Sequence, residues 1–303
     1  LFIDNYLNIN DRRFFIMGNI LLGLLPALMW GIQPLILQTI GGKTSNQQMG
    51  MSLGALIFSV GTLFFHQPPW TWHLIIASFI CGFAWAFGQI TQIESFHIIG
   101  VSAAMPISTG MQLIGVTMFG IFYFHEWSSS LDYVYGISAL IVIIIGVFFT
   151  AYKEKGDSSA KGNMQKGLFI LVLSTVGQVM YNVIPRMADL NGWDVLFPQG
   201  IGMAIGAMAF SFFFDKKPEL FSKKSFQNIL AGAAFALGNI GILLSNKANG
   251  VALGFTLSQM NVIVSTLGGI LFLKESRTSK ELKLTIAGLV LVALGGILIG
   301  LTK

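Results

Sequence analysis

The sequence predicts an all-α membrane protein whose ten transmembrane helices form two inverted five-helix repeats. Three observations carry this prediction: a composition poor in charge, a succession of apolar runs of membrane-spanning length, and a match between the two halves of the chain. Of the 303 residues, 54% are apolar and 10% are charged, whereas roughly 25% of the residues of a soluble domain are charged. So few charges cannot cover the surface of a soluble protein.

Apolar runs of about 20 residues, enough to cross the hydrocarbon core of a bilayer, follow one another between short polar loops. Residues 1–16, which precede Met17, are expected to be an N-terminal extension without a function. The ten predicted spans cover residues 18–40, 49–66, 72–94, 101–124, 132–151, 166–186, 195–214, 227–246, 251–273 and 281–301.

The second half of the chain matches the first at a nearly constant offset. The segment GFAWAFGQI at Gly82 aligns with GAAFALGNI at Gly232, which places Gln89 over Asn239. Farther along, TGMQ aligns with SQMN after a one-residue deletion. The order of these matches predicts an internal repeat, which is a feature of many transporters.

The repeat match also pairs Glu126 with Glu275 and sets the domain boundaries. We predict a first five-helix repeat over residues 17–152, a cytoplasmic linker over 153–165 and a second, inverted five-helix repeat over 166–303. The second repeat is inverted because each repeat contains an odd number of spans.

The distribution of basic residues supports the inversion. Loops 66–71 and 125–131 contain no Lys or Arg, whereas the corresponding loops of the second half are rich in them. The basic residues of these two loops are Lys216, Lys217, Lys223, Lys224, Lys274, Arg277, Lys280 and Lys283. Since basic loops stay on the cytoplasmic side, both termini are predicted to lie outside.

Polar and aromatic side chains gather on single faces of several predicted helices, since residues three and four apart share a face. Uncharged amides and hydroxyls beside aromatic rings suit a neutral ligand with many hydroxyl groups. The alternative is that these groups bond neighbouring helices to one another. The predicted substrate-binding residues are Trp30, Trp85, Gln89, Gln92, Thr109, Gln112, Gln178, Tyr181, Asn239, Ser258 and Asn261.

Glu94 is the one carboxylate expected within the membrane, since the other acidic residues fall in loops or at the edges of spans. Carboxylates within the membrane are candidates for a function. Glu94 lies about 140° around the helix from Gln89 and near the end of the span. It is therefore interpreted as an interfacial carboxylate, with proton coupling as the alternative.

Several classes of protein find no support in the sequence. The four histidines are scattered and Cys81 is the single cysteine, so no catalytic site, metal site or disulfide is predicted. No cofactor is expected. The net charge of +5 is attributed to membrane topology rather than to binding of nucleic acid.

Four segments of the chain resemble the bacterial glucose/ribose uptake permeases, a ten-span branch of the drug/metabolite transporter superfamily. The segments are GVSAAMPISTGMQLIG, WAFGQITQIESF, FHEW and LSQMNVIVSTLGGILFLKE, and the resemblance covers residues 17–303. The run YNVIPRM followed by GWDVLFPQGIGM is more similar to the glucose-uptake members. The resemblance implies import of a monosaccharide, coupled to protons.

The expected function is glucose uptake across the bacterial cytoplasmic membrane by alternating access. The expected partners are the sugar, protons and the lipid bilayer, without nucleic acid and without an obligatory protein partner. Two alternatives remain open: ribose uptake, and export of metabolites or drugs on the same scaffold. Facilitated diffusion remains an alternative to proton coupling. A sensor that binds sugar without transporting it is disfavoured, because the longest predicted loop is too short for an output domain.

Overall fold

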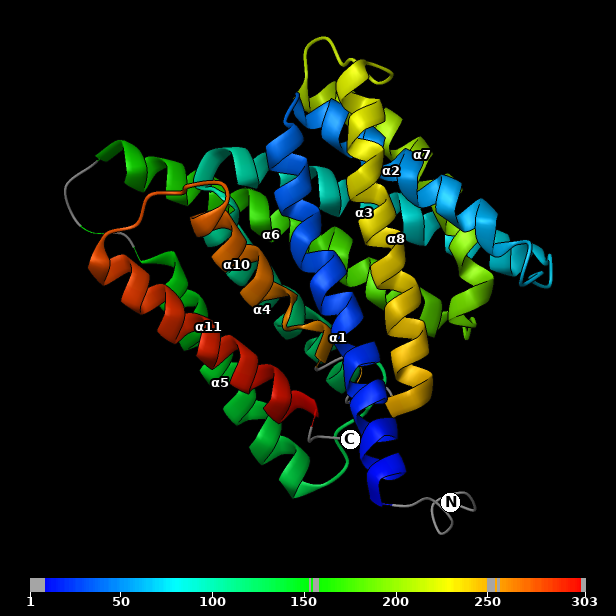
Figure 1. The fold of residues 1–303 in the computed structure, drawn as a ribbon, viewed down its shortest axis with the longest axis horizontal. Helices are drawn as coiled ribbons and strands as arrows, with labels where there is room; N and C mark the ends of the chain where they lie inside the picture. The colour runs from blue at the N-terminus through cyan, green and yellow to red at the C-terminus, as the bar shows by residue number, and fades with distance from the viewer. Residues whose placement is uncertain (1–8, 153, 155–157, 250–253, 255–256, 301–303) are drawn as a thin grey trace.

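Helices make up the regular secondary structure of the described part of the chain (Figure 1). The structure, a computed structural model, describes residues 9–152, 154, 158–249, 254 and 257–300. Within these residues the helices are α1 (Ile9–Ile40), α2 (Thr44–Thr62), α3 (Trp72–Ile99), α4 (Val101–Phe122), α5 (Ser130–Ala151), α6 (Ser158–Met187), α7 (Gly192–Phe214), α8 (Lys223–Asn249), α10 (Asn261–Leu271) and α11 (Ser279–Gly300).

Eight of the described helices are long and apolar enough to cross a membrane. The exceptions are α2, whose first turn is polar, and α10, which has 11 residues. The prediction of an all-α, multi-span membrane protein is therefore confirmed, and eight of its ten spans have a described helix of sufficient length and apolarity.

The predicted span 251–273 is not one continuous helix in the described residues. A turn at Gln259 and Met260 precedes α10. Around it, the amides of Met260, Val262 and Ile263 each bond to the carbonyl three residues earlier, the pattern of a tighter 3₁₀ turn. Residues 250–253, 255 and 256 of this span lie outside the described residues.

The polar segment before the second predicted span is helical and buried rather than a loop. Residues 44–48 form the first turn of α2, where loops of the second half bond two of the residues. The Ser45 amide donates to Asp215 Oδ2 at 2.8 Å, and Asn46 Nδ2 donates to the Glu219 carbonyl at 2.6 Å. Since these partners lie about 170 positions away in the sequence, local patterning does not predict them. Similarly, α6 begins at Ser158 and so includes the second part of the predicted linker.

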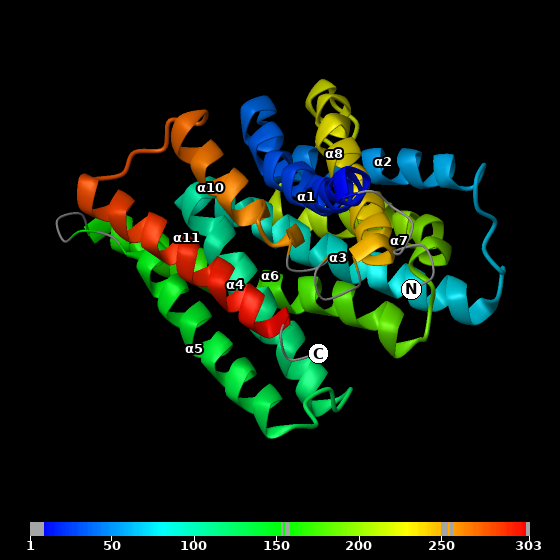
Figure 2. The same cartoon turned by 60° about the horizontal axis from the view of Figure 1, so that its bottom comes forward.

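Helices of one half pack mainly against helices of the other. α3 lies between α6 and α7, while α8 lies between α1 and α2. α4 packs against α6 and α10, and α10 also packs against α1. α5 and α11 lie side by side at one edge of the molecule (Figures 1 and 2). If α1 to α5 are exchanged for α6, α7, α8, α10 and α11, in that order, this set of contacts is unchanged.

The two ends of the molecule differ in charge. α1 begins and α11 ends at the same end, which we call the terminal end (Figure 1). The α7–α8 and α10–α11 connections lie at the opposite end. We call this opposite end the lysine-rich end, since these connections carry Lys216, Lys217, Lys274 and Arg277.

Glycines allow helices of opposite halves to touch along their backbones. A Cβ atom added to Gly232 of α8 would lie 2.2 Å from the Met51 carbonyl oxygen and 2.7 Å from the Cα of Gly54 on α2. Gly88 of α3 and Gly177 of α6 face each other in the same way. Such small residues are the usual means by which membrane helices approach closely, because lipid provides no hydrophobic drive for their association.

Replacing Gly232 by Ala should lower the stability of the protein, because the new methyl group meets backbone atoms that cannot move aside. We expect a loss of about 1–3 kcal/mol, as for other overpacked sites. Heating the detergent-solubilised protein and measuring the monodisperse fraction tests this. Gly61→Ala on α2 is the matched control, since no atom lies within 4 Å of the added methyl group. Equal stability of the two variants would contradict the importance of this contact.

Candidate functional site

A central cavity of about 660 Å³ lies between the two halves of the protein. Its walls come from α1, α3, α4, α6, α7, α8, α10 and α11, with further residues from the turn before α10 and from the loops of the terminal end. Ligand sites usually measure roughly 300–1,000 Å³, so the cavity can hold a small molecule.

The cavity opens toward the terminal end. Its solvent-exposed lining residues are Asn182, Arg186 and Asp189, in the last part of α6 and the loop that follows. Toward the lysine-rich end, the lining residues Gln92 and Met105 are buried. The structure therefore has access to the site from one side.

Aromatic rings form one wall of the buried part of the cavity. Trp85 of α3 is 1% exposed, and its ring centroid lies 4.6 Å from that of Phe235 on α8. Tyr181 of α6 completes the cluster at 6.4 Å from both rings. Trp30 of α1 also lines the cavity and donates its Nε1 hydrogen to the Phe235 carbonyl at 3.2 Å. These rings offer flat apolar surfaces and the Tyr181 hydroxyl.

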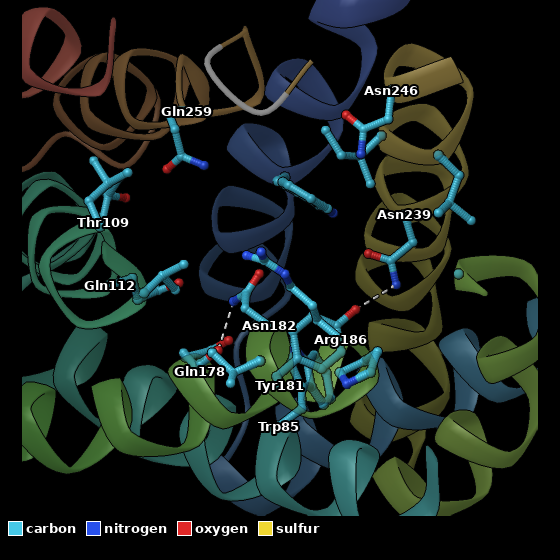
Figure 3. A pocket seen from close by; sticks show the side chains of 18 of the residues that line it. Trp85, Thr109, Gln112, Gln178, Tyr181, Asn182, Arg186, Asn239, Asn246 and Gln259 are labelled. Carbon is cyan, nitrogen blue, oxygen red and sulfur yellow. Dashed lines mark hydrogen bonds between the residues drawn. The ribbon is translucent and has the colours of Figure 1, made fainter. Parts of the chain in front are cut away.

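Two amides of opposite halves meet beside the aromatic wall. Gln178 Nε2 of α6 donates to Gln89 Oε1 of α3 at 3.3 Å. The Gln89 Nε2 group is buried and has no hydrogen-bond partner. Buried polar groups are nearly always bonded, so this donor is a candidate for contact with a ligand. Asn182, one turn after Gln178, donates to the Gln178 carbonyl at 2.7 Å (Figure 3).

A buried hydroxyl fixes two further amides on the opposite wall. Ser108 Oγ of α4 accepts hydrogen bonds from Gln92 Nε2 at 2.7 Å and from Gln112 Nε2 at 2.9 Å. Gln92, Gln112 and Thr109 all line the cavity. The Gln92 amide also donates to Met105 Sδ at 4.0 Å. The second hydrogen of the Gln112 amide and both carbonyl oxygens are available to a ligand by their chemistry.

The second half contributes Asn239 and Asn261 to the cavity, but it departs from the pattern of the first half at Ser258 and Gln259. Asn239 Nδ2 donates to the Tyr181 hydroxyl at 3.1 Å, and both residues line the cavity (Figure 3). Asn261 Nδ2 donates to the Ser258 carbonyl at 2.8 Å. Ser258 is fully buried and is not among the lining residues, whereas the adjacent Gln259 is.

The turn before α10 accounts for this departure. The repeat match places Gln259 over Gly110, which lies in the continuous helix α4 and faces Val147 on α5. Because the chain turns at Gln259 and Met260, the Gln259 side chain lies at the cavity on the side where Thr109 and Gln112 lie (Figure 3). The repeat alone would not have identified Gln259.

Charged side chains lie only at the open end of the described cavity lining. Arg186 donates to Glu126, and its guanidinium carbon lies 3.9 Å from the centroid of the Phe124 ring. Asp189 lies one turn farther along the chain. Sequence reasoning did not select Glu126, Arg186 or Asp189, because they lie at predicted span ends, where charges are ordinary. Gln33, Asn182 and Asn246 also line the cavity and belong to the polar faces that the sequence displays.

Glu94 is not among the residues that line the cavity. It lies toward the lysine-rich end of α3, where its Oε2 accepts a hydrogen bond from Thr44 Oγ1 at 2.7 Å. Thr44 Oγ1 lies 3.2 Å from His97 Nδ1, and His97 Nε2 lies 3.0 Å from Gln47 Nε2. A consistent assignment has Gln47 donating to His97, His97 to Thr44, and Thr44 to Glu94.

The buried part of the cavity is suited to a neutral polar ligand. Its described lining combines amide donors and acceptors with aromatic faces and contains no charged side chain. Of the eleven predicted substrate-binding residues, the structure brings together Trp30, Trp85, Gln89, Gln92, Thr109, Gln112, Gln178, Tyr181, Asn239 and Asn261.

Comparisons with known proteins agree in the kind of protein they find. The family model described as "Sugar transport protein" matches residues 21–302. A protein of Listeria monocytogenes that is provisionally named for sugar uptake is 48% identical over 94% of this chain and 99% of its own length. A Priestia megaterium protein provisionally named glucose uptake protein GlcU is 41% identical, with the same coverage of both chains.

Two further similarities extend these findings. The "Glucose uptake protein GlcU" of Bacillus subtilis is 39% identical over 94% of this chain and 99% of its own length. A solved crystal structure shares the fold with a TM-score of 0.57 at 15% identity, over 93% of this chain and 96% of the other. The chain belongs to the sugar transport protein family, and it is a multi-pass membrane transporter for sugar uptake rather than an enzyme.

Proposed function

We propose that the protein takes up glucose across the bacterial plasma membrane, with protons as the driving ion. The observation that carries the sugar site is the buried part of the central cavity, where the unpaired Gln89 Nε2 donor lies among uncharged amides and aromatic rings. The glucose-uptake names of the Priestia and Bacillus relatives favour glucose over ribose.

The proposed binding mode uses both faces of a sugar ring. Hydroxyl groups donate and accept hydrogen bonds, as the amides of Gln89, Gln112 and Asn261 also do. The C–H face of the ring stacks on the Trp85 and Tyr181 rings, which are rigid and apolar. The other proposed contacts are Trp30, Gln92, Thr109, Gln178 and Asn239, while Ser258 acts through its bond to Asn261.

Alternating access of two inverted repeats is the proposed mechanism. Two features support it: the match between residues 17–152 and 166–303, and the interchange symmetry of the helix contacts. Two halves related in this way can exchange conformations, which opens a central site to either side in turn. The positive-inside rule supports a cytoplasmic lysine-rich end, with both termini outside and the cavity facing outward.

Glu94 is the proposed proton-coupling residue. Its bonded chain through Thr44 and His97 connects a carboxylate with a second titratable group near the lysine-rich end. Chains of this kind transfer protons in other transporters.

Purified protein in proteoliposomes should take up radiolabelled glucose. With an inward proton gradient, the internal concentration should exceed the external one. Equilibration without accumulation would mean facilitated diffusion, whereas flux of ribose but not of glucose would reassign the substrate.

Replacing Gln89 by Ala should raise the KM for glucose by about three- to tenfold, because one net hydrogen bond is worth roughly 0.5–1.5 kcal/mol. Initial rates of uptake at varied glucose concentrations measure this. Gln48→Ala is the matched control, since Gln48 is a fully buried amide outside the cavity lining. An unchanged KM in Gln89→Ala would remove Gln89 from the site.

Replacing Glu94 by Gln should abolish accumulation driven by the proton gradient but preserve equilibration of glucose. Gln keeps the shape and the acceptor oxygen but cannot take up a proton. Glu219→Gln serves as the control, because Glu219 is an exposed carboxylate at the same end. Accumulation at the wild-type level in Glu94→Gln would assign the coupling to another group.

A further inference from the structure

The carboxylate of Glu275 connects the two halves of the protein at the lysine-rich end. Glu275 follows α10 in the second half, and its oxygens accept hydrogen bonds from the first two amides of α4 in the first half. The Val101 amide donates to Oε1 at 2.6 Å, and the Ser102 amide donates to Oε2 at 2.8 Å. Both bonds are charge-assisted, and the carboxylate lies at the positive end of the helix dipole.

The backbone on both sides of this contact accommodates the Glu275 carboxylate. Gly100 has a φ of +79°, and a Cβ atom there would lie 2.8 Å from the Glu275 Cδ and Oε2 atoms. A glycine is therefore required both by the backbone conformation and by the space. On the other side, the Glu275 amide bonds to the Gly269 carbonyl at 3.2 Å, which folds the residue back against α10.

Arg277 adds a second connection between the same elements. Its Nη2 donates to Ser102 Oγ at 3.3 Å, and its Nη1 donates to the Thr150 carbonyl in the last turn of α5 at 3.5 Å. Burial lowers the pKa of the Arg277 guanidinium, while the carboxylates of Glu281 and Glu275 oppose that shift. The guanidinium is thus partly buried and hydrogen-bonded within the protein.

These contacts lie at the end where the cavity is closed. Separation of the end of α10 from the start of α4 at this end would break both bonds of Glu275. The repeat match pairs Glu275 with Glu126, and Glu126 lies at the open end with Arg186 as a partner. The equivalent carboxylates thus occupy the closed and the open ends of one pathway.

We propose that Glu275 is a latch that holds the lysine-rich end shut while the cavity is open at the terminal end. Release of its carboxylate from the α4 N-terminus is the step that lets the cavity open to the other side. The inference rests on the proposed alternating access, and it concerns the conformational equilibrium rather than contact with the substrate.

The test measures access to a buried thiol in full-length protein in inside-out and right-side-out vesicles. Cys81→Ser removes the native thiol, and Ala104→Cys places a reporter in the first turn of α4, where Ala104 is fully buried. A membrane-impermeant methanethiosulfonate is added to either side without sugar. Glu275→Gln should raise the labelling rate from the lysine-rich side about tenfold. The Gln oxygen can accept from one backbone amide of α4, but its NH2 group faces the other amide, so one charge-assisted hydrogen bond is lost.

Two further variants keep the test decisive. Glu219 forms an exposed ion pair with Lys43 on the same side. Glu219→Gln should leave the labelling rate unchanged, since exposed ion pairs contribute little to the stability of a conformation. Gly100→Ala displaces the carboxylate from the α4 side of the contact and should raise the rate as Glu275→Gln does.

A monodisperse elution profile of each purified variant in detergent establishes that it is folded. Folded Glu275→Gln and Gly100→Ala proteins with unchanged labelling at residue 104 would overturn the latch. Because no sugar is present, this result is independent of the glucose-uptake assay, which alone decides the proposed substrate.

Discussion

Close backbone contact between helices of opposite halves is the constraint on which the rest of this structure depends. Gly88 and Gly177 allow α3 and α6 to touch, and each glycine directly precedes an amide of the cavity. The short distance between the helices therefore brings Gln89 and Gln178 within hydrogen-bonding distance. In the same way, Gly238 accommodates the Trp30 ring immediately before Asn239. Packing and site are thus set by the same contacts.

The distribution of charge follows from the cost of placing ions in a low-dielectric interior. The buried part of the cavity uses amides, which bond to a ligand without the desolvation cost of an ion. Charged groups lie at the two ends, and two carboxylates there bond to the other half: Glu126 to Arg186 at the open end, and Glu275 to the amides of α4 at the closed end. In the proposed alternating access, opening and closing the ends changes the contacts of these carboxylates, while the neutral site between them keeps its chemistry.

The two halves are similar in packing but unequal in the site. α4 is continuous through Pro106, while the corresponding segment turns at Gln259 and Met260 before α10 begins. A turn of this kind changes which side chain faces the cavity, so Thr109 lines it and its counterpart Ser258 does not. An asymmetric ligand gains different contacts from the two walls, since an amide faces it at Gln259 where the first half has Gly110.

The sequence by itself determined the all-α membrane class, the order of the spans and most of the polar faces, because apolar run length and helical periodicity are local properties. It also placed Trp85, Gln89 and Gln112 in the candidate site, since amides and aromatic rings on one helix face stand out against aliphatic neighbours.

Only the tertiary structure decided that Thr44 to Gln48 are a buried helical turn, that Gln259 rather than Ser258 lines the cavity, and that Glu275 binds the start of α4. In each case the deciding feature is a contact with a residue far away in the sequence, or a backbone turn that the pattern of side chains does not predict. Local periodicity describes which face of a helix is polar, whereas the partner of that face is chosen by how the two halves pack together.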